Sequence, residues 1–171
     1  MRFSLPLFCL LLVSSLTTPA LAGGGLYAAF GGGLLTFDDG ADEVKPKQLA
    51  GRFGYQINDY IGLGFESGFS LIEDELFGLD WDVTTTFLYL RGSLPVSEQA
   101  SIYFLVGPTD VSVTGSRGIF SGTADDDDTG TGFGFETRLD TVSLYLDYIT
   151  YNDNDGVEVT SLNLGVATYF H

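Results

Sequence analysis

The sequence predicts an all-β fold, an eight-stranded antiparallel up-and-down transmembrane β-barrel with an N-terminal signal peptide. Three features carry this prediction: strict two-residue alternation of apolar and polar residues, charges that stay off one face of that alternation, and an apolar segment near the N-terminus. A tilted membrane-spanning strand needs about nine to eleven residues, and an even number of antiparallel strands closes without edges. The eight segments that alternate and are long enough are 25–37, 47–57, 60–72, 82–94, 100–113, 130–139, 141–151 and 158–170.

The N-terminal segment has the organisation of a signal peptide. Arg2 supplies a positive charge, residues 5–13 form an apolar run, and Ala20-Leu21-Ala22 is a small-x-small cleavage site. The run is too short to span a bilayer as a helix. We therefore assign residues 1–22 to a signal peptide for Sec-type export and residues 23–171 to one barrel domain.

Composition excludes several classes of site. The chain of 171 residues has a positive mean hydropathy of +0.20 and yet a net charge of -16, so apolar and acidic residues must be segregated. The only cysteine, Cys9, lies in the predicted signal peptide, so we expect neither disulfides nor a thiolate metal site in the barrel. The sequence contains no phosphate-binding loop, dinucleotide fingerprint or basic patch. We expect no cofactor and no nucleic-acid partner.

The hairpin from Gln48 to Leu71 indicates which face meets lipid. One face of its two strands is apolar, with residues such as Phe53 and Phe65, whereas the other carries glycines together with Arg52 and Glu66. A soluble barrel would place the apolar face inside. Here the polar face has the character of a barrel interior and the apolar face that of a lipid-facing wall. The alternative of a soluble periplasmic barrel that binds an apolar ligand requires the opposite arrangement.

The same alternation gives uncharged outward rows in the other strands. A single Arg or Lys at the bilayer midplane costs about 2–4 kcal/mol, so a lipid-facing wall must be free of charge. The predicted outward residues are Leu26, Ala28, Phe30, Leu34, Leu88, Leu90, Ile102, Phe104, Val106, Phe133, Phe135, Leu139, Val142, Leu144, Leu146, Tyr148, Leu162, Leu164, Val166 and Phe170.

The predicted connections alternate between short and long. Short turns on one side of the membrane and long loops on the other are typical of transmembrane barrels. Residues 58–59, 95–99 and the turn at Asp140 are short, and the long connections are 38–46, 73–82, 114–129 and 152–157. Aromatic residues near strand ends, among them Tyr151 at the long-loop end and Tyr169 at the short-turn end, are expected to form girdles at the two interfaces.

The last strand carries a family resemblance. Residues 163–170 (NLGVATYF) resemble the assembly signal of bacterial outer-membrane barrels, which Asn163, Gly165 and Phe170 match, while Thr168 stands where a large apolar residue is usual. Together with the signal peptide and eight strands, the chain resembles the small OmpA-like and OmpX-like barrels, including the opacity or "porin family" type. The resemblance implies a place in the bacterial outer membrane, contact with its lipids and lipopolysaccharide, and insertion by the barrel assembly machinery.

Six charged residues are predicted to face the lumen. Because an unpaired buried charge costs several kcal/mol, these cations and carboxylates should pair. One interpretation is a gate in which re-pairing opens a narrow water path, as the resemblance to OmpA-like barrels allows. The other is a static network that fills an interior just wide enough for side chains. The six are Arg52, Glu66, Arg91, Glu136, Arg138 and Asp147.

Sixteen of the 23 acidic residues gather in the long connections. Carboxylates are suitable ligands for Ca²⁺ or Mg²⁺, so weak binding of divalent cations is one interpretation. Simple solvation and mutual repulsion of flexible loops is the other. The residues are Asp38, Asp39, Asp42, Glu43, Glu73, Asp74, Glu75, Asp80, Asp82, Asp125, Asp126, Asp127, Asp128, Asp153, Asp155 and Glu158.

No catalytic group stands out. Some barrels of this size modify lipids with a histidine, a serine and an acid, but the single histidine, His171, lies beyond the last predicted strand. We therefore expect a non-enzymatic protein with a structural or surface-interaction role, or at most a narrow pore, and neither a catalytic nor a metal site. A lipid-modifying barrel enzyme of the outer membrane is the alternative.

Overall fold

The computed structural model describes residues 24–38, 43–71, 80–117, 120–154 and 157–170, and the predicted signal peptide lies outside them. No helix in these ranges is long and apolar enough to cross a membrane. The strands are β1 (Gly25–Asp38), β2 (Glu43–Val44), β3 (Lys47–Gln56), β4 (Ile61–Ser70), β5 (Asp80–Pro95), β6 (Ala100–Arg117), β7 (Phe120–Leu139), β8 (Val142–Asn154) and β9 (Val157–Phe170).

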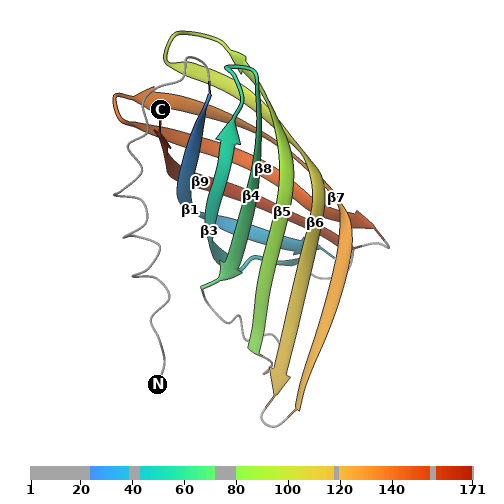
Figure 1. Cartoon of the computed structure of the whole chain (residues 1–171). Coiled ribbons are helices and arrows are strands. Elements are labelled where there is room, and N and C mark those ends of the chain that lie inside the picture. Colours follow the sequence, from blue (N-terminus) through green and yellow to red (C-terminus); the bar gives the residue numbers. More distant parts are fainter. Residues whose placement is uncertain (1–23, 39–42, 72–79, 118–119, 155–156, 171) are drawn as a thin grey trace, which may run out of the picture.

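The sheet closes on itself. Each long strand pairs antiparallel with its neighbour in the chain, and β1 also pairs with β9, for example at Gly31 opposite Gly165. β2 is a two-residue strand that pairs with the end of β1, so eight long strands make up the wall. The prediction of an eight-stranded antiparallel barrel is confirmed. Figure 1 shows the strongly tilted strands around one interior.

The apolar rows lie on the outside of the wall. Leu164 is 63% exposed and Phe104 is 61% exposed, whereas their inward neighbours Asn163 and Tyr103 are each 1% exposed. The alternation follows from the strand period of two, which sends successive side chains to opposite faces. The predicted orientation, apolar outside and polar inside, is therefore confirmed, and it is the reverse of what a soluble barrel requires.

Inward glycines make room for inward tyrosines. A Cβ added at Gly134 would lie 2.5 Å from Cζ of Tyr103, and one at Gly64 would lie 2.7 Å from Cζ of Tyr89. The tyrosine rings thus lie directly against the backbone of other strands. A narrow barrel can hold this many rings only because the facing positions carry no side chain.

This packing gives a first prediction. We expect Gly134→Val to lower the free energy of unfolding by about 1–3 kcal/mol, because the valine side chain would overlap the Tyr103 ring. Urea unfolding in lipid vesicles measures the change. Gly51→Val is the matched control, since a Cβ at Gly51 meets nothing within 4 Å. Equal losses for the two variants would contradict the packing argument.

Three strands are longer than the sequence pattern predicts. The predicted segments 82–94, 100–113 and 130–139 are parts of β5, β6 and β7, which have 16, 18 and 20 residues. The expected long connection 114–129 is mostly strand, since β6 and β7 pair continuously from Ala100 opposite Thr137 to Arg117 opposite Phe120. Figure 1 shows β5, β6 and β7 running past the other strands. We call residues 80–84, 109–117 and 120–130 the ribbon.

A β-bulge in β8 lies where the described pairing between β7 and β8 ends. The pairing of β8 with β9 shifts by one residue between Thr150 and Asn152, and the extra residue, Tyr151, is fully buried. The main-chain oxygen of Tyr151 accepts a hydrogen bond from the Thr109 hydroxyl at 2.5 Å. The described pairing of β7 with β8 starts only at Thr131 opposite Thr150. Because bulges bend a strand and end its ladder, β8 and β9 diverge from β7 at this point.

Candidate functional site

The centre of the lumen holds one guanidinium between two carboxylates. Arg52 on β3 donates through Nε to Glu66 on β4, and its Nη1 and Nη2 lie 2.5 and 3.1 Å from the carboxylate oxygens of Asp147 on β8. Arg52 is 7% exposed, Asp147 is 2% exposed and Glu66 is fully buried. The three residues lie near the middle of their strands, at the height where the outer side of the wall faces lipid. We call them the central cluster.

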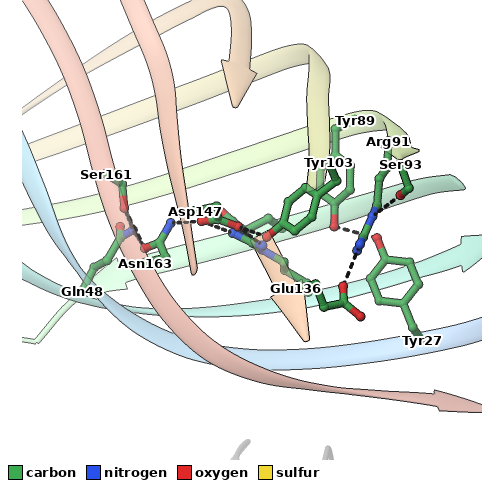
Figure 2. Close-up of polar contacts among 12 residues, drawn as sticks. Tyr27, Gln48, Tyr89, Arg91, Ser93, Tyr103, Glu136, Asp147, Ser161 and Asn163 are labelled. Atoms are coloured by element: carbon green, nitrogen blue, oxygen red, sulfur yellow. Dashed lines mark hydrogen bonds and ion pairs between the residues drawn. The ribbon is translucent and has the colours of Figure 1, made fainter. Parts of the chain in front are cut away.

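Neutral side chains donate further hydrogen bonds to both carboxylates of the central cluster. Tyr103 donates to Asp147 at 2.6 Å, Asn163 donates to Asp147 at 3.1 Å, and the Tyr151 hydroxyl donates to Glu66. Figure 2 shows Asp147 between Tyr103 on one side and Asn163 on the other. A buried carboxylate is stable only when its oxygens are hydrogen-bonded, and these donors supply what a second cation would.

The polar chain continues from Asn163 toward the long-loop end. Gln48 Nε2 lies 2.9 Å from Asn163 Oδ1 and 2.6 Å from Ser161 Oγ, and the Ser161 hydroxyl donates to Asn163 at 2.6 Å. All three residues are 1% exposed. Of the predicted assembly signal, Asn163 is therefore also a buried member of the lumen network, and Gly165 lies beneath the ring of Tyr145.

A second ion pair lies nearer the short turns. Arg91 on β5 contacts Glu136 on β7 at 2.6 Å, and it also donates to Ser93 at 3.0 Å and to the Tyr169 hydroxyl at 3.2 Å. Tyr169 in turn donates to Glu136 at 2.9 Å. We call Arg91, Glu136 and Tyr169 the mouth cluster. Arg91 is 8% exposed and Glu136 is 5% exposed.

Tyrosine rings separate the two clusters. The Tyr27 and Tyr89 hydroxyls are 2.7 Å apart, and the Arg91 guanidinium stacks on the Tyr103 ring at 4.1 Å from its centroid. On the other side Arg52 stacks on the Tyr145 ring at 4.5 Å. Such stacking favours the cations as well as filling space. Two ionic layers thus lie in series along the lumen, with aromatic rings between them.

Arg138 differs from the other five predicted lumen charges. It is exposed at the opening between the short turns, and within the described residues it forms no ion pair. Its guanidinium lies 5.6 Å from the centroid of the Tyr169 ring. A cavity of about 470 Å³ occupies this opening and ends at the mouth cluster, with Arg138 on its wall. The alternation predicts that Arg138 faces inward, but it does not predict how far along the barrel axis the residue lies from the central cluster.

Two predicted interfacial aromatics lie in the lumen instead. Their positions near strand ends predict Tyr151 and Tyr169 in the girdles, and both predictions are wrong: Tyr151 is fully buried against Glu66, and Tyr169 bonds to Arg91 and Glu136. Tyr151 keeps the inward side that Tyr145, Asp147 and Ile149 share, and the bulge makes the next residue, Asn152, buried as well. Strict alternation from the outward residues Leu146 and Tyr148 places Tyr151 inward, and alternation from Val166 does the same for Tyr169, so the sequence carries this signal for both.

The acidic segments are partly strand. Asp125–Asp128, expected in a loop, belong to β7, and Asp38, Asp80, Asp82, Asp153 and Glu158 lie in other strands, with Glu43 in β2. Asp39, Asp42, Glu73, Asp74, Glu75 and Asp155 lie outside the described residues. Across the described ranges, no three His, Cys, Asp or Glu side chains are grouped so that they could hold a metal ion.

The comparisons with known proteins agree with this architecture. The sequence model of the family described as "Outer membrane protein beta-barrel domain" matches residues 8–170. The chain belongs to this family. As a member it is a small β-barrel of the bacterial outer membrane, and the predicted family and location are confirmed at this level. A search of curated protein sequences gave no significant match.

Solved outer-membrane barrels share the fold. The attachment invasion locus protein Ail of Yersinia pestis is 18% identical, with a TM-score of 0.68 over 88% of this chain and 100% of Ail. Neisserial surface protein A is 15% identical, with a TM-score of 0.69 over 86% of this chain and 99% of its own. OprG of Pseudomonas aeruginosa is 15% identical, with a TM-score of 0.59 over 88% and 98%. At these identities the likeness concerns the fold.

Proposed function

We propose that this outer-membrane barrel is a non-enzymatic surface protein with a closed lumen, and that it acts through the ribbon. The observation that carries the proposal is the contrast between the two parts of the molecule. Inside the wall, charged and tyrosine side chains of the central and mouth clusters pair with one another across the lumen. Outside the wall, three strands continue as a sheet that the barrel itself does not need. With short turns periplasmic, as is usual for such barrels, the ribbon is extracellular.

A shortened ribbon tests the surface role. Val111 lies opposite Asp126, so an Asn-Gly turn in place of residues 112–125 joins two residues that already face each other. We expect this short-ribbon variant to insert and fold, because the membrane-spanning pairs of β6 and β7 remain, and to lose adhesion of expressing bacteria to host-cell monolayers. Retention of the folded, heat-modifiable band on gels is the control. Unchanged adhesion by a variant that folds would contradict the surface role.

A narrow pore is the second candidate, favoured by the cavity at the short-turn opening. For a pore, both ionic layers must open. Glu136→Ala removes a partner from the mouth cluster only, and the central cluster remains in place behind it. We therefore expect planar bilayers with wild type and with Glu136→Ala to show no sustained current. A current in either protein, altered by charge reversal at Arg138, would support the pore and contradict the closed lumen.

The absence of catalysis remains part of the proposal. A lipid-modifying barrel needs a nucleophile with an activating base, and the buried acids here are held by arginine and tyrosine partners in the lumen, away from the lipid-facing wall. Mass spectra of lipid A from bacteria with and without the protein provide the test. An altered acyl pattern that depends on the protein would favour the enzyme. The proposal also includes three properties expected from the sequence. The protein is exported by the Sec pathway, it is inserted by the barrel assembly machinery, and its acidic segments bind divalent cations weakly.

Ail offers a useful contrast in charge. Its structure in complex with the heparin analogue sucrose octasulfate shows that Ail binds a polyanion. In the present chain, β7 carries four consecutive aspartates at residues 125–128, and β6 contributes Asp110 opposite Asp127. A polyanionic ligand would be repelled from such a surface. A surface partner of the ribbon should therefore carry positive charge.

A further inference from the structure

The cavity at the short-turn opening carries charges that the barrel itself does not pair. Arg91 and Glu136 lie at its inner end and form the ion pair of the mouth cluster. Arg138, Asp59 and Glu98 also line the cavity, and all three are exposed. Within the ranges that the structure describes, none of these three side chains forms an ion pair. One cation and two carboxylates are therefore available to a ligand.

The available charges of opposite sign come from opposite sides of the barrel. Asp59 lies in the turn between β3 and β4, whereas Arg138 lies near the end of β7. In the closed ring of strands, β5 and β6 stand between these two places on one side, and β8, β9 and β1 on the other. Glu98 belongs to the side of Arg138, because the Arg138 N–H donates to the main-chain oxygen of Gln99 at 2.7 Å. A ligand across the opening thus meets a carboxylate at one end and a guanidinium at the other.

The charges of the lining select the kind of ligand. Two arginines and three carboxylates give the lining a net charge of -1. A purely anionic molecule would be attracted by Arg138 and repelled by the carboxylates, and a purely cationic molecule would be repelled by Arg138. A molecule with an ammonium group at one end and a carboxylate at the other is complementary to both sides of the opening.

The size and polarity of the cavity suit a short, polar chain. Its volume of about 470 Å³ lies within the range of about 300–1,000 Å³ that is usual for small-molecule sites. Ser97, Gln99 and Ser101 add hydrogen-bonding side chains to the lining, and Gly24 and Gly25 add main chain without side chains. A free amino acid carries both of its charges on one carbon atom, whereas the terminal charges of an extended peptide move apart by about 3.3–3.6 Å per residue.

We propose that the cavity at the short-turn opening binds a short peptide with free termini, with its ammonium group toward Asp59 and its carboxylate toward Arg138. The Tyr169 ring lies beside the Arg138 guanidinium and borders the carboxylate end of the site. The site is at the other end of the barrel from the ribbon, so it does not depend on the surface role. With the short turns periplasmic, the ligand is a periplasmic peptide.

The probe is trialanine, titrated into the ¹⁵N-labelled barrel in nanodiscs of zwitterionic lipid. We expect saturable changes in the amide shifts of cavity residues such as Gln99 and Arg138. N-acetyl-trialanine lacks the ammonium group and trialanine amide lacks the carboxylate, so each should bind about two- to fivefold more weakly, the size expected for one solvent-exposed ion pair. Free alanine should bind more weakly than trialanine, because it cannot reach both sides of the opening.

Two variants assign each end of the peptide. Arg138→Gln should bind trialanine and trialanine amide equally and still discriminate against N-acetyl-trialanine. Asp59→Asn should show the reverse, with equal binding of trialanine and N-acetyl-trialanine. Each variant thus loses its preference for one terminus only, and a purely structural role of these side chains would not produce this crossed pattern.

Asp140→Asn is the matched control. Asp140 is an exposed aspartate in the turn between β7 and β8, and it does not line the cavity. Its substitution removes the same charge from the same rim and should leave both preferences unchanged, with the folded gel band as control for all variants. Absence of trialanine binding, equal binding of the three trialanine probes to the wild type, or the same loss of preference in Asp140→Asn would overturn the proposed site. Equal binding of alanine and trialanine would overturn its assignment to a peptide.

Discussion

Arg52→Met is expected to be among the most damaging single substitutions in the lumen. Removal of the guanidinium leaves Glu66 and Asp147 as two buried carboxylates without a cation between them, although both keep their tyrosine donors. Breaking a buried ionic group by removing one partner costs about 3–5 kcal/mol. Urea unfolding of the protein in lipid vesicles should show a loss of this size, or a failure to fold at neutral pH.

The control is a matched change in the other cluster. Arg91→Met also removes a guanidinium, but Glu136 keeps its hydrogen bond from Tyr169 and borders the cavity at the short-turn opening. We expect a smaller loss there. The triple variant Arg52→Met, Glu66→Gln, Asp147→Asn should recover much of the stability, because it removes the charges together. Equal losses for Arg52→Met and Arg91→Met, with no recovery in the triple variant, would contradict the assigned role of the central cluster.

Leu164→Arg is expected to have the other large effect. Leu164 is 63% exposed in the middle of β9, where the outward row must contact hydrocarbon. An arginine on the lipid face near the bilayer midplane costs about 2–4 kcal/mol. Reduced folding yield into vesicles and a lower unfolding midpoint are the measurements.

Val96→Arg provides the comparison at similar exposure. Val96 is 53% exposed in the turn between β5 and β6, outside the predicted hydrocarbon layer, so arginine there should be tolerated. Leu164→Phe controls for the loss of leucine itself. If both arginine variants fold equally well in bilayers, the outward row does not contact lipid.

The wall of the barrel could be predicted from the sequence because its pattern is local. In Leu162, Asn163 and Leu164 the face of each residue follows from its place in a strand of period two, and burial agrees. The hairpin of β3 and β4 likewise places Arg52 directly opposite Glu66, so this contact follows from the register alone.

Two features could not be found in the same way. Beyond Val113 the ribbon sequence lacks the apolar-polar alternation that marks the wall, and pairing with the neighbouring strand overrides the low strand propensity of four aspartates. The contact between Arg52 and Asp147 joins residues 95 positions apart, and only closure of the barrel brings them together. A sequence pattern predicts which face of the wall each residue is on, but not its position along the barrel axis. This position is what distinguishes the exposed Arg138 from the buried Arg91.

The extra residue of the bulge, Tyr151, links the stability of the lumen network to the pairing of the strands that lead into the ribbon. Its side chain hydrogen-bonds to the buried acid Glu66, and its backbone forms the bulge next to which the described pairing of β8 with β7 ends. Deleting this single residue would restore regular pairing there, and the same deletion would take a donor from Glu66. A change to the ribbon that acts through this residue therefore also alters the rigidity of the barrel. Substitutions farther along the hairpin of β6 and β7 do not.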